Sequence, residues 1–233
     1  MKRLAFVLLL AVPSLLVAQA AAEPPVLPFD SASFRGGAID NPHFPLTPGT
    51  MFIFEIRDDR DHSIDTLEVL ADTKRIAGVT VTVVHDREWR RGVLVEDTYD
   101  WYAQDIYGNV WYLGEDTKSY TNGKKPSTAG SWKAGTAGAS AGIIMRAKPK
   151  LGESYRQEYR KGVAEDMARV VSVTDAEAVR AGKFKGCVTT EDWSPLEPNV
   201  KERKTYCPGA GLVRGRTVTG GLERTELIAI VTP

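Results

Sequence analysis

The segment from Asp97 to Thr117, with the sequence DTYDWYAQDIYGNVWYLGEDT, constrains the fold more than any other part of the chain. Two runs rich in Trp, Tyr and Val flank residues 106–109, and the pair Gly108-Asn109 suits the left-handed backbone of a tight antiparallel reversal. The segment therefore predicts a β-hairpin that carries much of the aromatic surface of the chain.

The predicted register of this hairpin places large apolar groups on both of its faces. A reversal about Tyr107 and Gly108 sets Tyr102 opposite Leu113. One face then carries Trp101, Ala103, Val110 and Tyr112, and the other carries Tyr102, Trp111 and Leu113. Antiparallel strands with one wet face alternate more cleanly than this, so we expect other parts of the chain to cover both faces.

The same register brings carboxyl groups together. Asp100 lies opposite Glu115, and a slip of one residue sets it opposite Asp116 instead. Like charges directly opposite each other destabilise a ladder unless a cation or a basic side chain lies between them. Two interpretations follow. In the first, the pair lies at a solvated rim, where water and Lys118 or Lys124 balance its charge. In the second, Asp100, Glu115 and Asp116 form a calcium site. We favour the solvated rim, because motif matches have a high false-positive rate.

Residues 1–22 match a secretory signal peptide. Lys2 and Arg3 form the charged start, residues 4–17 form the apolar region, and small residues precede position 22. The apolar run is too short for a membrane-spanning helix, and no long apolar run follows it. We therefore expect a secreted or periplasmic protein with no membrane span.

The charge balance excludes several classes of partner. Cleavage after residue 22 removes two of the 30 basic side chains and none of the 30 acidic ones, which leaves a net charge of about −2. Charges of both signs are interspersed along the chain. The sequence therefore predicts neither the basic stripe of a nucleic-acid-binding protein nor a polybasic patch for a membrane surface.

The mature chain divides into a short lead and one domain. Residues 23–49 contain six prolines, which predict an extended, irregular lead. From Thr50 onward, short β runs recur at roughly even spacing, and no helical periodicity is sustained. Residues 50–233 are thus expected to form a single, mainly β domain: an antiparallel meander that forms a barrel or strongly curved sheet, with at most one short helix. A Gly/Ser/Lys-rich loop at 121–142 contains Trp132, which is expected to pin the loop to an apolar surface.

Two cysteines predict a structural disulfide. Cys187 and Cys207 are symmetric about Glu197, within a turn that contains two prolines. A simple hairpin brings the cysteines directly opposite each other, at a spacing that a disulfide bridges. The same register pairs Glu191 with Arg203, and export supplies the oxidising conditions that the bond requires.

Tests for common catalytic motifs assign no catalytic residue. Ser140 lies in a G-x-S-x-G pattern, but small residues precede it, and all three histidines come before it in the chain. The histidines lack the close spacing of metal ligands, and no phosphate-binding glycine loop follows a strand. Asp100 with Glu115, beside several aromatic residues, is the one place where a carboxylate-dependent hydrolase would be sought.

Four segments resemble a family of functionally uncharacterised secreted bacterial proteins: DWYAQDIYGNVWYLGEDT, NPHFPLTPGT, YRQEYRKGVAEDMA and WSPLEPNVKERKTYCPGAGLV. The resemblance spans most of the mature chain and implies export. It brings no catalytic residue with it. The turn residues Ile106 and Tyr107 are less charged than is common in that family. The resemblance is therefore weak support for a cation bound at this turn.

These observations predict an exported, non-enzymatic β protein that binds an apolar or amphipathic small ligand. The predicted ligand-binding residues are Trp101, Tyr102, Trp111, Tyr112 and Trp132, with the loop around Trp132 as a lid. Three alternatives stay open. The aromatic residues simply fill a core, the acidic residues hold calcium in a structural or protein-interaction scaffold, or the protein is a carboxylate-dependent hydrolase.

Overall fold

The computed structural model describes residues 23–59, 61–121 and 124–233. The predicted signal peptide at 1–22 and residues 122–123 of the predicted loop lie outside these ranges. The described residues are almost entirely β-structure and irregular connections. Their only helical element is a short 3₁₀ turn, η1, at Ser31–Ser33.

The strands form one 14-stranded sheet in which every paired neighbour is antiparallel. They are β1 (Met51–Arg57), β2 (His62–Ile76), β3 (Val79–Arg90), β4 (Val93–Gln104), β5 (Val110–Ser119), β6 (Trp132–Lys133), β7 (Ser140–Met145), β8 (Ser154–Arg156), β9 (Glu158–Tyr159), β10 (Met167–Val179), β11 (Gly182–Trp193), β12 (Lys201–Cys207), β13 (Gly211–Thr219) and β14 (Arg224–Val231). The prediction of a mainly β antiparallel meander is confirmed.

The hydrogen-bonded path through the sheet is open. It runs β8-β10-β11-β12-β13-β14-β1-β2-β3-β4-β5-β7-β9, and β6 adds to β5. Strands β8 and β9 end the path and are separated in the chain by Gln157 alone, yet β8 pairs with β10 and β9 pairs with β7. No pairing between described residues joins these two end strands, so the predicted barrel is not supported. Each end strand is short and already pairs with a different neighbour.

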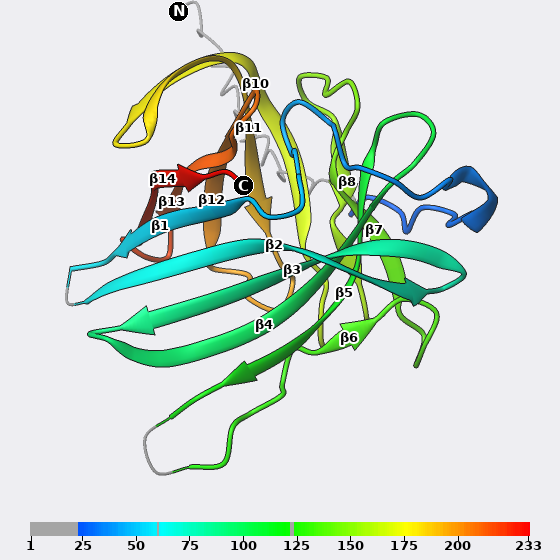
Figure 1. Cartoon of the computed structure of the whole chain (residues 1–233), viewed down its shortest axis with the longest axis horizontal. Helices are drawn as coiled ribbons and strands as arrows, with labels where there is room; N and C mark the ends of the chain where they lie inside the picture. Colours follow the sequence, from blue (N-terminus) through cyan, green and yellow to red (C-terminus); the bar gives the residue numbers. More distant parts are fainter. Residues whose placement is uncertain (1–22, 60, 122–123) are drawn as a thin grey trace, which may run out of the picture.

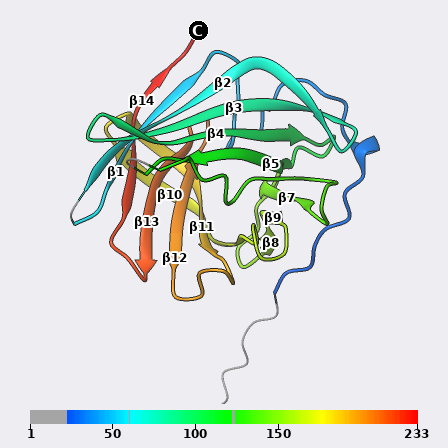
Figure 2. The ribbon, with the colours of Figure 1, turned by 90° about the horizontal axis from the view of Figure 1, so that it is seen from below.

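Two parts of the sheet lie face to face. In Figures 1 and 2, β2 to β5 form one layer of long strands, and β10 to β13 form a second, connected to the first through β14 and β1. One buried cluster includes Leu113 and Val188, and another includes Phe54 and Val213. Apolar side chains from both layers thus form the core.

The predicted hairpin exists, but its register changes part of the way along. Strands β4 and β5 pair Asp100 with Glu115 as predicted, whereas Tyr102 lies opposite Tyr112 rather than Leu113. A β-bulge at Gly114 absorbs the extra residue on β5. Because a shift of one residue moves side chains to the other face, the predicted division of the aromatic residues between the two faces is wrong.

The bulge decides which aromatic rings meet. Tyr112 stacks on Tyr102, with ring centroids 4.9 Å apart, whereas the prediction had placed these rings on opposite faces. On the other face, Trp111 lies opposite Ala103 and receives edge contacts from Phe29 and Phe34 of the lead. Both faces of the hairpin are therefore covered, and segments from outside the hairpin supply part of the cover.

The cysteine prediction is confirmed. Cys187 of β11 and Cys207 of β12 form a disulfide with a Cα–Cα distance of 4.2 Å. The two strands pair with Glu191 opposite Arg203, which is the register that symmetry about Glu197 predicts. The bond therefore links two strands of the second layer.

Residues of the lead lie against the hairpin in irregular conformation. The side-chain oxygen of Gln104 accepts hydrogen bonds from the backbone N–H groups of Asp40 and Asn41, at 3.0 and 2.9 Å. The backbone N–H of Ile106 donates to the carbonyl of Ser33 at 2.9 Å. The side-chain amide of Asn41 also donates to the carbonyl of Gly108 at 2.9 Å, so polar contacts tie the lead to both ends of the turn between β4 and β5.

We expect Gly114→Ala to destabilise the protein much more than Gly92→Ala. Both glycines have positive φ, +126° and +78°, so both substitutions strain the backbone. A Cβ at Gly114 would also lie 2.3 Å from the backbone oxygen of Trp132, whereas a Cβ at Gly92 meets nothing within 4 Å. The Gly114 variant should lose roughly 2 kcal/mol more in urea unfolding. Equal losses in the two variants would show that the β5–β6 contact does not constrain the bulge.

Candidate functional site

The inner face of β2 to β5, which is turned toward the second layer, carries carboxyl groups at successive positions. Asp65 of β2 lies opposite Glu88 of β3, and Glu88 lies opposite Glu96 of β4. Farther along the same face, Asp100 lies opposite Glu115. Because alternate residues of a strand share a face, all five side chains point the same way. The Asp100–Glu115 pair found in the sequence is one part of a larger acidic surface.

Part of this acidic surface lines a cavity of about 420 Å³ between β2–β4 and β12–β14. Its acidic lining residues are Asp65, Asp86, Glu88, Glu96, Glu202 and Glu223. Ile56 and Leu212 contribute apolar surface, and the other polar groups come from Lys204, Arg216, Thr217 and Thr225. Glu223 is exposed in the turn between β13 and β14, so the cavity reaches solvent on that side.

The cavity has an excess of negative charge. Glu88 pairs with Arg90 at 3.2 Å, and Glu202 pairs with Lys204 at 3.5 Å. Lys204 also lies 3.4 Å from the carboxylate of Asp192, so its charge is already shared. The other four carboxyl groups of the lining make no ion pair with any residue that the structure describes.

Asp65 and Asp86 reduce their mutual repulsion by sharing a proton. Burial is the largest cause that raises the pKa of Asp86 well above its ordinary value, and the charge of Asp65 raises it further. Asp86 therefore keeps its proton and donates it in a hydrogen bond to Asp65. Burial also raises the pKa of Asp65, to about 6, although this hydrogen bond opposes the shift.

Asp100 and Glu115 are joined through a tyrosine. The Tyr112 hydroxyl lies 2.5 Å from Asp100 Oδ1 and 2.9 Å from Glu115 Oε2. Burial raises the pKa of Asp100 well above its ordinary value and raises the pKa of Glu115 to about 7. The hydroxyl has one proton to donate, and a protonated Asp100 completes the second contact. Asp100 is only 7% exposed, so the solvated-rim interpretation is wrong.

The structure does not bring the predicted calcium ligands together. Asp116 is exposed, lies opposite Tyr99 and, as the neighbour of Glu115 in a strand, points to the other face. Within the described ranges, no group of three or more His, Cys, Asp or Glu side chains is placed to hold a metal ion. Burial raises the pKa of both Asp100 and Glu115, and protons retained on these groups reduce the repulsion between them.

The five predicted ligand-binding aromatic residues lie in or beside the core. Trp101, Trp111, Tyr112 and Trp132 are between 3% and 8% exposed, and Tyr102 is half-buried. Lys74 covers the Trp101 ring, with Nζ 3.9 Å from its centroid. Trp132 belongs to β6 and packs edge-on against Tyr112. Trp111 alone among them lines one of the cavities described here, a space of about 250 Å³ beneath the lead.

Reading the sequence missed the acidic cavity, although one signal for it is present. In β3, Asp86 and Glu88 occupy alternate positions, so a strand there places both carboxyl groups on one face. The other contributions come from the neighbouring strands β2 and β4, and from β12 and the turn before β14, which are distant in sequence. Their meeting depends on the order of the strands in the sheet.

We expect the protein to be more stable at pH 5 than at pH 8. Burial raises the pKa of Asp65 to about 6, of Glu115 to about 7 and of Glu158 to about 8. Between the ordinary and the raised values, the folded state holds protons that the unfolded chain has released, so the free energy of unfolding falls as the pH rises. Thermal unfolding at both pH values measures this difference.

A single substitution separates Glu158 from the other groups. Glu158→Gln should raise the melting temperature at pH 8 more than at pH 5, because the native side chain is already neutral at pH 5. Glu197→Gln, in the exposed turn before β12, is the matched control and should leave the pH difference unchanged. A wild-type melting temperature that is higher at pH 8 than at pH 5 would contradict the assignment of retained protons.

Comparison with known proteins identifies the fold but not a function. No protein-family model matches the chain, and no curated protein matches it. The chain is similar to the crystal structure of a Bacteroides fragilis NCTC 9343 protein that is inferred to be exported and has a YmcC-like fold. The TM-score is 0.50 and the sequence identity 15%, over 81% of this chain and 98% of that one.

A second similar structure comes from Parabacteroides distasonis ATCC 8503 and is inferred to be a lipoprotein, with a TM-score of 0.41, 15% identity and the same coverage. No helix among the described residues is long and apolar enough to cross a membrane. The Cys187–Cys207 disulfide is consistent with a location outside the cytoplasm. The similarity to the Bacteroides structure assigns this chain a YmcC-like β fold.

Proposed function

We propose that this protein is an exported binding protein that takes up a small organic cation, such as an amine, in the acidic cavity. One observation carries the proposal: the cavity contains four carboxyl groups that make no ion pair with a described residue. Buried carboxyl groups without a cationic partner cost free energy, and in this protein they keep protons instead. A bound ammonium group would replace those protons.

The size and lining of the cavity suit such a ligand. Its volume of about 420 Å³ lies within the range of roughly 300–1,000 Å³ that is typical of small-molecule sites. Asp65, Asp86 and Glu96 would accept hydrogen bonds from the cationic group, while Ile56 and Leu212 would contact an alkyl part. This is an amphipathic ligand, as the sequence predicts, but one with a positive charge.

Two other functions receive less support. The cavity lined mainly by apolar residues, including Phe44, Phe52 and Phe54, has a volume of only about 40 Å³, which is too small for a purely apolar organic ligand. Asp100 and Glu115, the candidate hydrolase pair, line none of the cavities described here. A substrate therefore has no described space beside them.

Titration with spermidine, a linear amine with several positive charges, tests the proposed function. We expect the mature protein to bind spermidine at pH 8 and to release protons on binding, measured by calorimetry in buffers of different ionisation enthalpy. Affinity should fall at pH 5.5, because protonated carboxyl groups lose their attraction for a cation. Asp65→Asn and Asp86→Asn should each weaken binding by about tenfold or more.

Asp116→Asn is the matched control, because it removes an exposed carboxyl group outside the cavity. This variant should bind spermidine like the wild type. Triethylene glycol, which is uncharged, should not bind. Equal spermidine affinity in the wild type and the two cavity variants, or affinity that does not change with pH, would refute the proposed function.

A further inference from the structure

A row of arginines crosses the face of the sheet opposite to the one that carries Lys204 and Thr225, and one of its members, Arg216, also lines the acidic cavity. Arg57 of β1 lies opposite Arg224 of β14, and Arg224 lies opposite Arg216 of β13. Arg216 in turn lies opposite Arg203 of β12. These four residues, the arginine row, occupy four neighbouring strands. Because neighbouring strands are about 4.8 Å apart, the row extends over about 14 Å.

The two central arginines form no ion pair with a described residue, although, after hydrogen bonds from Ser172 and Thr189, the charge of Arg216 also lowers the pKa of Asp175 in β10. At the ends of the row, Arg57 binds Glu55 at 2.8 Å, and Arg203 binds Glu191 at 3.4 Å. Arg216 and Arg224 are both exposed and make no ion pair with any residue in the described part of the chain. Like charges placed directly opposite each other destabilise a ladder, so this arrangement brings no evident benefit to folding.

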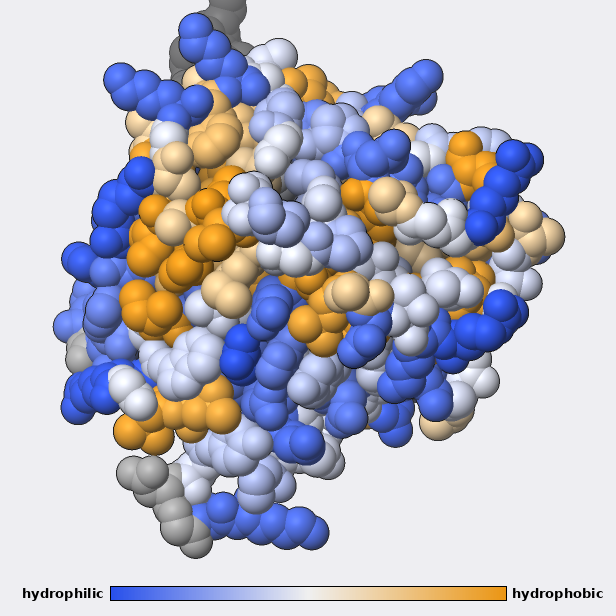
Figure 3. Space-filling model, in the orientation of Figure 1, coloured by the Kyte–Doolittle hydropathy of each residue, from blue (hydrophilic) through white to orange (hydrophobic). Residues whose placement is uncertain are grey.

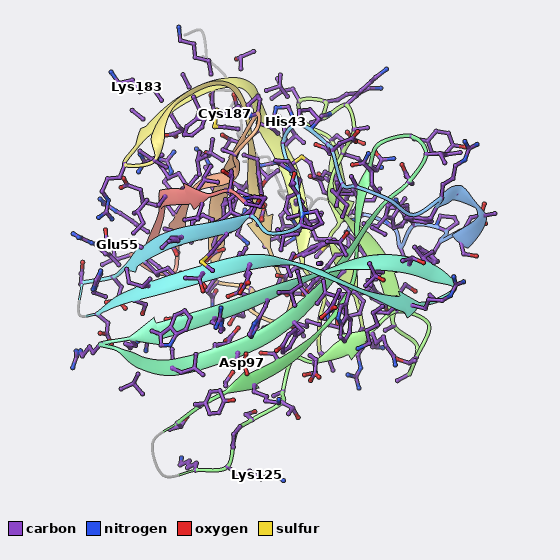
Figure 4. The ribbon with its side chains drawn as sticks, in the orientation of Figure 1. His43, Glu55, Asp97, Lys125, Lys183 and Cys187 are labelled. Carbon is purple, nitrogen blue, oxygen red and sulfur yellow. A yellow bond between two sulfur atoms is a disulfide. The ribbon has the colours of Figure 1, made fainter. Side chains whose placement is uncertain are left out.

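A surface groove of about 420 Å³ runs beside the row and is lined by Arg57, Arg180, Arg214 and Arg224. Hydrophilic residues gather at the left margin of Figure 3, where Figure 1 places the turn between β1 and β2. The acidic group Glu226 also lines the groove, as does Glu55, which is labelled in Figure 4. Three basic side chains already bind the Glu55 carboxylate: Arg57, His62 and Arg180.

We propose that the arginine row and its groove bind a linear polyanion, specifically an acidic polysaccharide that carries carboxylate groups along its chain. Guanidinium groups bind carboxylates through two parallel hydrogen bonds and remain charged at any physiological pH. Exposed arginines at regular spacing along a line can bind successive anionic groups of an extended chain. The row meets the acidic cavity at Arg216 and the groove meets it at Thr225, but the proposed polyanion site does not depend on the proposed cation site.

The surroundings of the row favour a polymer over an anionic membrane. Glu55 of β1 lies opposite Glu226 of β14, two residues along the strands from the pair of Arg57 and Arg224. A flat anionic surface pressed against this face would place lipid head groups beside these two carboxylates. A single extended chain can follow the arginines and avoid the glutamates. The disulfide, which is consistent with a place outside the cytoplasm, makes a polysaccharide the more accessible partner than a nucleic acid.

Binding of polygalacturonate, a linear polymer of carboxylated sugars, tests this inference. We expect the mature protein to bind immobilised polygalacturonate at low salt, and to bind more weakly as salt screens the charges. The double variant Arg216→Gln/Arg224→Gln should lose roughly tenfold or more in affinity. Its melting temperature should not fall, because the substitution removes two opposed like charges.

Lys148→Gln/Lys150→Gln is the matched control, because it removes the same charge from exposed positions between β7 and β8. This variant should bind polygalacturonate like the wild type, and neutral dextran should not bind. An equal loss in both double variants would show attraction by net charge alone and overturn the site. Tighter binding of anionic vesicles or single-stranded DNA, lost in the arginine variant, would overturn the polysaccharide assignment.

Discussion

Like charges lie directly opposite each other on both faces of this sheet, and the antiparallel register causes it. On the inner face the charges are carboxyl groups, and on the outer face they are guanidinium groups. On the inner face, retained protons reduce the repulsion between the carboxyl groups. Examples are the hydrogen bond from Asp86 to Asp65 and the contacts of Tyr112 with Asp100 and Glu115. The outer face cannot reduce its repulsion in this way, because a guanidinium group keeps its proton at physiological pH. Water instead screens the repulsion between the exposed arginines.

Other parts of the molecule have to offset the loss of stability that these opposed like charges cause. Buried carboxyl groups and opposed arginines both reduce the free energy of unfolding. Two apolar clusters that join the layers and the Cys187–Cys207 disulfide contribute in the opposite direction. A disulfide that closes a loop of this size contributes about 3 kcal/mol by restricting the unfolded chain. A fold that accepts destabilising charges at defined places, and stabilises itself elsewhere, is typical of proteins that bind ligands at those places.

Local patterns predicted much of the sheet. The β pattern expected from Thr50 onward begins with β1 at Met51. The symmetry of the cysteines about Glu197 gave the correct pairing of β11 with β12. These predictions succeed because a hairpin connects neighbours in sequence, so the turn alone determines the register. The bulge at Gly114 escaped prediction, because it depends on the approach of Trp132 from a separate segment.

The sequence by itself determined the β class and the disulfide, since each follows from alternation or from symmetry about a turn. Only the tertiary structure decided where the charges gather. Asp65, Glu88, Glu96 and Lys204 meet around one cavity because β12 to β14 face β2 to β4, and no spacing along the chain encodes that contact. In the same way, a sequence with interspersed charges predicts no basic patch. The order β12-β13-β14-β1 aligns one arginine from each strand, since residues opposite each other in a ladder become neighbours whatever their separation in the chain.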